Sequence, residues 1–309
     1  MKILFFGTPE FSLKSLEVLD KHHQVLLVVT QPDKRKGRGK KLQMTPVKEY
    51  AQRAGIPVFQ PANVNSSDSI SFIREFSPDI AVVVAYGQII SSHILDLPKL
   101  GCYNIHASLL PSYRGAAPIN SAIINGDTKT GVTIMKMDKG MDTGDILISR
   151  DIPLDYSDTA GLLHDRLSIL GSEAMQEAIE ILQNGKASFI RQNENLATYA
   201  PKISKEMGEI DWSKGSEKIR NIIRGLNPWP LAYTYLNGVK MKILEADCVQ
   251  CENNLRYGTY IGVHDKGFLV NTGDGCVLLK RIQFPSKKAM YSDEYARGHI
   301  IEPGTIFGK

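Results

Sequence analysis

The sequence contains no apolar run that approaches the roughly 20 residues needed to cross a bilayer. Its N-terminus also lacks a basic segment followed by an apolar block, so residues 1–7 are predicted to form a first strand and not a signal peptide. Only four cysteines occur among 309 residues, which is too few for a disulfide framework in a chain of this length. These absences favour a protein of the reducing cytoplasm without membrane association.

Several motifs of nucleotide binding and covalent catalysis are missing as well. A single glycine, Gly7, stands where Gly-x-Gly-x-x-Gly would be expected, and Gly-x-x-x-x-Gly-Lys-Ser/Thr is absent. No Gly-x-Ser-x-Gly motif marks a nucleophilic serine. Cys248 and Cys251 are half of a zinc pattern without a second half, so we expect two ordinary cysteines and no metal. Dinucleotide, P-loop and metal sites are therefore not expected.

Strand patterns alternate with helical patterns through the first part of the chain. Residues 2–7, 24–30 and 79–85 are apolar runs typical of strands covered on both faces, and residues 159–182 have the spacing of a long amphipathic helix. A polar stretch follows, and then short alternating runs interrupted by glycine. We predict an α/β fold with a mostly parallel, Rossmann-like domain at residues 1–189, a linker at 190–208 and a small OB-like β-barrel at 209–309.

Three polar residues in the centre of the sequence could form a reactive site. Asn104 and His106 lie two residues apart on a predicted strand, so they share one of its faces, and Asp142 follows in a later loop. An imidazole can transfer a proton near neutral pH, a carboxamide can donate to a developing oxyanion, and a carboxylate can orient the imidazole. This set suits attack by an amine on a carbonyl. Taken without its surroundings, however, Asn-x-His is more typical of a hydrogen-bonded strand end than of a reactive site, and Asp142 alone is typical of a turn.

The motifs around Asn104, His106 and Asp142 resemble those of a known family. Asn104-x-His106-x-Ser108-Leu109-Leu110-Pro111-x-Tyr113-Arg114-Gly115, followed by Asp138 to Asp145, closely resembles the folate-dependent formyltransferase family. Residues 6–11, 37–48 and 223–230 extend the resemblance over essentially the whole chain. It implies a parallel α/β catalytic domain joined to a C-terminal β-barrel. The implied reaction moves a formyl group from 10-formyltetrahydrofolate to the α-amino group of methionine on initiator tRNA.

The resemblance also implies roles for individual residues. Asn104 and His106 would bind the formyl oxygen, and His106 would also handle the proton. Asp142 would orient His106 and help, through water, to take the proton from the attacking amine. The folate pocket would be lined by residues of two loops, namely Ser108, Leu109, Leu110 and Pro111 with Tyr86, Gly87 and Ile89. The same resemblance implies translation initiation in the cytoplasm by a monomer that needs no metal.

A basic segment supplies a candidate tRNA-binding surface. The net charge is only +4, so the chain as a whole is no polycation, but Lys34, Arg35, Lys36, Arg38, Lys40 and Lys41 crowd into eight residues. Such a run is more often a solvated surface. Here its glycines allow close approach of the backbone, and an acceptor stem offers phosphates and a shallow minor groove, which favours tRNA contact. Trp229, between two prolines, is predicted to be a packing residue.

Two other functions share parts of this pattern. A formyltransferase acting on a small amine, either a glycinamide ribonucleotide or an amino sugar nucleotide, would share Asn104, His106 and Asp142. It would not need the basic segment or a basic second domain. A non-catalytic RNA-binding protein on an α/β scaffold would need no folate and would tolerate the loss of His106.

Overall fold

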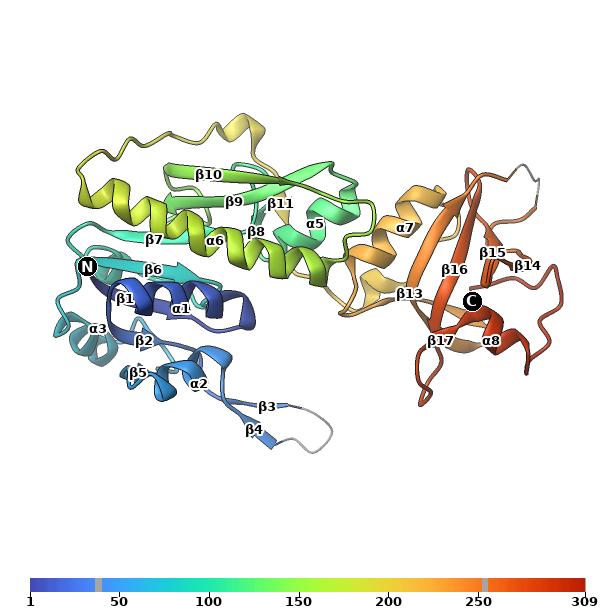
Figure 1. Ribbon diagram of the computed structural model, residues 1–309, viewed down its shortest axis with the longest axis horizontal. Coiled ribbons are helices and arrows are strands. Elements are labelled where there is room, and N and C mark those ends of the chain that lie inside the picture. The colour runs from blue at the N-terminus through green and yellow to red at the C-terminus, as the bar shows by residue number, and fades with distance from the viewer. Residues whose placement is uncertain (37–40, 252–254, 309) are drawn as a thin grey trace. The chain divides into compact units, whose positions relative to one another are not determined.

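The computed structural model describes residues 1–36, 41–251 and 255–308 (Figure 1). Its contacts divide the chain into two compact units. Unit 1 comprises residues 1–115, 130–152 and 164–200, and unit 2 comprises residues 116–129, 153–163 and 201–309. The predicted linker begins at residue 190, whereas unit 1 continues to Ala200. Unit 2 also takes two earlier segments, because helix α5 (Pro118–Asn125) packs against helix α7 (Ser216–Gly225).

Unit 1 is built on a seven-stranded sheet of order β10-β9-β7-β6-β1-β2-β5. Strands β5, β2, β1, β6 and β7 run parallel, and β9 lies antiparallel to β7. The bounds are β1 (Lys2–Gly7), β2 (Gln24–Val29), β5 (Val58–Phe59), β6 (Ile80–Val84), β7 (Cys102–His106), β9 (Lys129–Lys136) and β10 (Ile146–Pro153). Every residue of β6 is buried, as the continuous apolar run predicts for a strand with both faces covered. The predicted mostly parallel α/β domain is confirmed.

Helices and short strands complete unit 1. The helices are α1 (Leu13–His22), α2 (Pro46–Arg53), α3 (Ser67–Arg74), α4 (Ser92–Leu95) and α6 (Ala160–Gln183), whose first residues belong to unit 2, with single turns at Glu10–Ser12 and Glu194–Leu196. Helix α2 begins at Pro46, because proline suits the first turn of a helix and the Thr45 hydroxyl accepts from the Lys48 amide at 3.2 Å. Two small sheets pair β3 (Lys34–Lys36) with β4 (Lys41–Gln43) and β8 (Arg114–Gly115) with β11 (Tyr199–Ala200).

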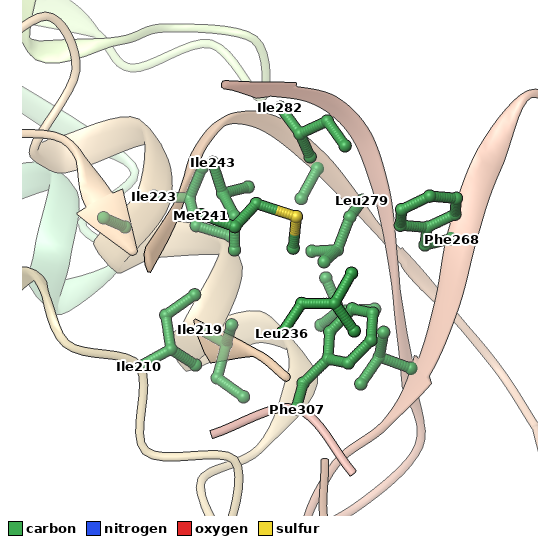
Figure 2. Packing of buried hydrophobic residues seen from close by; sticks show 14 of the residues in the cluster. Ile210, Ile219, Ile223, Leu236, Met241, Ile243, Phe268, Leu279, Ile282 and Phe307 are labelled. Atoms are coloured by element: carbon green, nitrogen blue, oxygen red, sulfur yellow. The ribbon is translucent and has the colours of Figure 1, made fainter. Parts of the chain in front are cut away.

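Unit 2 contains an antiparallel sheet of order β12-β13-β16-β15-β14, with β17 paired to β16. Its elements are α7, β12 (Ala232–Leu236), β13 (Val239–Val249), β14 (Tyr260–His264), β15 (Gly267–Asn271), β16 (Cys276–Gln283), β17 (Met290–Tyr291), α8 (Ser292–Ala296) and a turn at Glu206–Gly208. Alternate residues of β13, such as Met241 and Ile243, point into a core that α7 covers with Ile219 and Ile223 (Figure 2). The predicted second, β-rich domain is confirmed, and it is built on an antiparallel sheet. Among the described residues this sheet does not close into the predicted barrel.

A disulfide joins Cys251 to Cys276, which the sequence did not predict. In the antiparallel pair of β13 and β16, Val249 lies opposite Cys276. The chain leaving β13 therefore returns Cys251 to a Cα–Cα distance of 5.8 Å from Cys276, within the range of a disulfide. The expectation that Cys251 is an ordinary cysteine was wrong, since the pairing depends on a strand register that composition does not reveal. Cys102 and Cys248 remain free thiols.

Loss of this disulfide should destabilise unit 2. The two cysteines are 25 residues apart, and closing a loop of that length stabilises a fold by about 3 kcal/mol in the chain-entropy model. We expect Cys251→Ser to lower the free energy of unfolding by that order in oxidising buffer and to have little effect in the presence of a reductant. Urea unfolding in both buffers measures this, with Cys248→Ser as the matched control. Equal stabilities in oxidising buffer would contradict the prediction.

No helix in the described ranges is long and apolar enough to span a membrane. Within the same ranges, no three His, Cys, Asp or Glu side chains come together as a set that could hold a metal ion.

Candidate active site

The candidate site lies at the carboxyl end of β7. Asn104 and His106 lie on one face of this strand, opposite Met135 and Thr133 of β9, and Asn104 pairs with Val83 of β6. The ends of parallel strands β6 and β7 therefore meet at the same edge of the sheet, where ligands bind in open α/β folds. Three of the predicted folate residues lie in the loop after β6 and four in the loop after β7, so both loops with predicted folate residues lie at this edge.

His106 is buried and its ring is oriented by a backbone group. The Nε2 atom lies 2.9 Å from the Tyr113 carbonyl oxygen, and only 5% of the residue is exposed. A carbonyl can only accept, so Nε2 carries the hydrogen and Nδ1 is the nitrogen that can take up a proton. Nδ1 faces Asp142, whose Oδ1 is 3.7 Å away, beyond hydrogen-bond distance but within the range of an ion pair.

Asp142 is held by its own contacts. Its Oδ2 accepts a hydrogen bond of 2.8 Å from the Gly115 amide. Its backbone has a left-handed conformation with φ of 56°, and Tyr113, which holds the other side of the His106 ring, has φ of 61°. Residues with a side chain adopt this region at a cost of about 1–2 kcal/mol each, and such strain concentrates at functional sites. Both neighbours of the His106 ring thus occupy costly conformations that the fold maintains.

The Asn104 side chain is half-buried and available. Within the described part of the chain its carboxamide has no hydrogen-bond partner, although it lies two residues before His106 on the same face. An amide N–H that is already placed and not otherwise engaged can donate to a ligand oxygen without reorganisation. Asn104 and His106 therefore present an open donor and a proton-accepting nitrogen on one strand.

The predicted folate residues in the loop after His106 are of two kinds: some side chains are engaged within the protein, and others are partly exposed. The Ser108 hydroxyl donates to the Ser112 carbonyl at 2.6 Å, and Leu110 packs in a small cluster with Met135 and Ile146. These two side chains hold the loop together. Leu109 and Pro111 are only partly buried, and the Leu110–Pro111 peptide is cis. Of the four predicted folate residues in this loop, Leu109 and Pro111 are therefore the ones whose side chains can contact a ligand.

The predicted folate residues in the loop after β6 likewise include both buried and exposed side chains. The Tyr86 side chain is buried against Phe6, with ring centroids 5.3 Å apart, and this burial raises the pKa of its phenol well above the usual value. The Thr8 hydroxyl fixes the Tyr86 carbonyl at 2.8 Å. Gly87 has φ of 89°, which glycine adopts without strain, and Ile89 is 81% exposed. Ile89 thus offers apolar surface at the edge of the sheet, while the Tyr86 ring belongs to the core.

The predicted tRNA-binding residues lie on or between β3 and β4. Lys34 and Arg35 are exposed, Lys36 and Lys41 are described only by their backbone, and Arg38 and Lys40 lie outside the described residues. Just before β3, the carboxylate of Asp33 accepts from Lys48 Nζ at 2.6 Å and from Gln60 at 2.7 Å. The hydrogen bond from Lys48 lowers the pKa of Asp33. These two hydrogen bonds attach the base of the hairpin to α2 and to the segment after β5.

Sequence reasoning missed two site residues, because it placed Gln192 and Glu194 in a linker. Both contact the buried guanidinium of Arg114, which is 1% exposed. Gln192 also donates to the Asp142 carbonyl at 2.8 Å. Arg114 could have indicated that a partner was missing, because an arginine buried in the protein requires an anionic partner. The sequence could not indicate which carboxylate supplies it.

Comparison with known proteins identifies the family of this chain. The formyl transferase family model matches residues 1–179, and the model of the formyl transferase C-terminal domain matches residues 202–300. The chain belongs to the formyl transferase family.

Individual relatives show which members of the family this chain is similar to. The methionyl-tRNA formyltransferase of Clostridium tetani is 50% identical over 99% of both chains, and that of Clostridioides difficile is 47% identical over 100% of both. Over its whole length the chain is thus similar to methionyl-tRNA formyltransferases. Among solved structures, the N-formyltransferase from Helicobacter canadensis, in complex with folinic acid and dTDP-3-aminofucose, shares the fold. It has a TM-score of 0.66 and 22% identity, over 92% of this chain and 100% of that one.

Proposed function

We propose that this chain transfers the formyl group of 10-formyltetrahydrofolate to the α-amino group of methionine on initiator tRNA, a step of translation initiation in the cytoplasm. Its similarity to methionyl-tRNA formyltransferases extends over the full length of the chain and carries the proposal. The arrangement of Asn104, His106 and Asp142 supports it, because these side chains meet the needs of amine attack on a formyl carbon.

Asn104 stabilises the charge that develops in the reaction. The amine nitrogen forms a bond to the formyl carbon, and the bond from that carbon to the folate nitrogen then breaks. Negative charge collects on the formyl oxygen between these steps. The free carboxamide of Asn104 donates a hydrogen bond to this oxygen. Because a carboxamide neither gains nor loses a proton, it can donate this hydrogen bond in every turnover without a change of protonation state.

His106 and Asp142 handle the proton. The amine must lose one proton as it becomes an amide, and the folate nitrogen must gain one as it leaves, so the overall transfer is neutral. His106 Nδ1 can accept the first proton, because Nε2 is already committed to the Tyr113 carbonyl. Asp142, with Oδ1 at 3.7 Å, stabilises the charged ring until the proton is returned. A water between the amine and Asp142 would shorten the path.

The folate is proposed to bind at the sheet edge beside His106. Leu109, Pro111, Gly87 and the exposed Ile89 supply its apolar and backbone contacts. Ser108, Leu110 and Tyr86 act there by shaping the two loops, since their side chains are engaged inside the protein. The Helicobacter canadensis structure of similar fold contains folinic acid, which supports a folate as the formyl donor.

The tRNA is proposed to contact the basic hairpin and unit 2. Lys34 and Arg35 are exposed and can reach phosphates, and Lys36, Arg38, Lys40 and Lys41 stay predicted contacts. That the protein acts as a monomer stays a prediction, which sedimentation of the purified chain would test.

A single assay separates this function from its two rivals. The purified chain is incubated with 10-formyltetrahydrofolate and, in separate reactions, methionyl initiator tRNA, glycinamide ribonucleotide or an amino sugar nucleotide. We expect formylation of methionyl-tRNA only. Preferential formylation of either small amine would establish the small-acceptor function instead. Tight tRNA binding without formylation of any acceptor would favour the alternative of a non-catalytic RNA-binding protein.

A further inference from the structure

We propose that Gln192, clamped by Arg114, is a positioning residue that fixes Asp142 beside His106. The inference rests on the proposed function, because it assumes that Asp142 takes part in the reaction. It is carried by a closed ring of hydrogen bonds among residues of unit 1 that are far apart in the sequence.

The first part of the ring is the Gln192 carboxamide. Its Nε2 donates to the carbonyl oxygens of Asp142 at 2.8 Å and Gly144 at 2.7 Å. Its Oε1 accepts from Arg114 Nη2 at 2.9 Å and from Arg114 Nε at 3.2 Å. Carbonyls only accept and a guanidinium only donates, so the amide can have one orientation alone. The side chain is buried and its full hydrogen-bonding capacity is used, which makes it a rigid spacer.

The second part is Arg114, which keeps Gln192 in place. Its guanidinium is 1% exposed and makes two further hydrogen bonds of 2.8 Å to the two carboxylate oxygens of Glu194. A buried guanidinium is stable only with a counter-charge, and a bidentate carboxylate fixes its plane. The hydrogen bond from Arg114 lowers the pKa of Glu194, so this carboxylate stays charged near neutral pH. Arg114 therefore presents Nε and Nη2 to Gln192 in one fixed direction.

The third part closes the ring at Asp142. Gly115, the next residue after Arg114, donates its amide hydrogen to Asp142 Oδ2 at 2.8 Å. One short segment thus holds Asp142 twice, directly at its carboxylate and through Gln192 at its backbone carbonyl. The left-handed backbone of Asp142, with φ of 56°, would relax without such support. What remains free is Asp142 Oδ1, the atom that faces His106 Nδ1.

The competing explanation is that Gln192 only attaches its segment to unit 1. The two explanations differ in how a Gln192 substitution combines with a change at Asp142. A residue that acts through Asp142 has nothing left to position once that carboxylate is gone, so its effect disappears in that background. An attachment role weakens the protein in either background, so the two losses multiply.

The experiment measures steady-state formylation of methionyl-tRNA by Gln192→Met, Asp142→Asn and the double variant. Methionine matches the length of glutamine but forms none of these hydrogen bonds. A misplacement of about 1 Å can cost two orders of magnitude in rate, so we expect Gln192→Met to lower kcat by about 10- to 100-fold. KM for tRNA and folate should stay within about two-fold, since the Gln192 side chain is buried and its hydrogen-bonding groups are all engaged within the protein. The double variant should be no slower than Asp142→Asn.

Asn195→Ala is the matched control, because it lies on the same segment, is exposed and makes no side-chain contact with the ring. It should retain the wild-type kcat. The proposal is overturned if Gln192→Met keeps full turnover while Asp142→Asn is slow, or if the two losses multiply. If Asp142→Asn itself is as fast as wild type, the role of Asp142 and this inference fail together. If the wild-type chain does not formylate methionyl-tRNA, the proposed function fails first and the inference with it.

Discussion

Alanine substitution of Asn104, His106 or Asp142 is expected to lower the rate of formylation by about 10²–10⁴-fold, the usual effect of losing an oxyanion donor or a general base. Each loss has a separate cause in the structure. Asn104→Ala removes the free carboxamide, His106→Ala removes Nδ1, and Asp142→Ala removes the charge that faces Nδ1. Single-turnover rates with saturating folate and methionyl-tRNA measure the chemical step directly.

The double variants provide the sharper test. Residues that act on one transition state as a unit lose much less together than the product of their separate losses. We expect His106→Ala combined with Asp142→Ala to be little slower than His106→Ala alone, because the proposed action of Asp142 is on the ring that has been removed. All variants should unfold cooperatively like the wild type. Near-normal turnover of a folded single variant would exclude that residue from the mechanism.

Serine substitution of the six basic hairpin residues should change how salt weakens tRNA binding. Each phosphate contact that is lost reduces the slope of log affinity against log salt by about 0.7 to 0.9. If most of Lys34, Arg35, Lys36, Arg38, Lys40 and Lys41 contact phosphate, the slope should flatten by about 3 to 5 units. At low salt this is a loss of several orders of magnitude in affinity. KM for folate should not change, because its proposed loops follow β6 and β7.

The serine substitutions leave the contacts at the base of the hairpin in place. Lys48, which pairs with Asp33 at 2.6 Å, is left intact, so the strand entering the hairpin keeps its attachment. A charge-matched control replaces the exposed Lys14, Lys21 and Arg53 with serine and is compared with Lys34, Arg35 and Lys36 replaced together. Salt titrations that are parallel for the hairpin variant and the wild type would show that the hairpin is only a solvated surface.

The sequence predicted the elements whose pattern is local. The apolar runs at residues 2–7 and 79–85 gave strands with nearly the observed bounds of β1 and β6, and the helix expected at residues 159–182 is found as Ala160–Gln183. The shared face of Asn104 and His106 followed from a two-residue spacing on a strand. Such features depend on neighbours in the sequence, so one chain is enough to reveal them.

The missing parts of the site depend on distant residues. Tyr113 holds His106 through a backbone carbonyl, Gly115 holds Asp142 through a backbone amide, and neither group has a side-chain signature. Gln192 is 50 residues from Asp142, in a polar stretch whose composition is that of a linker. The Cys251–Cys276 pair needed the register of β13 against β16. These contacts are products of the tertiary fold, and no local pattern encodes them.

The left-handed backbone of Asp142 makes it possible to arrest the enzyme with both substrates in place. Asparagine tolerates φ near 56° as readily as aspartate does, and its side-chain oxygen can still accept from the Gly115 amide. Asp142→Asn would therefore keep the shape of the site while removing the charge beside His106. Bulkier or branched residues at this position would distort the loop. Asp142→Asn is thus the variant with which to trap and crystallise an unreacted complex of folate and aminoacylated tRNA.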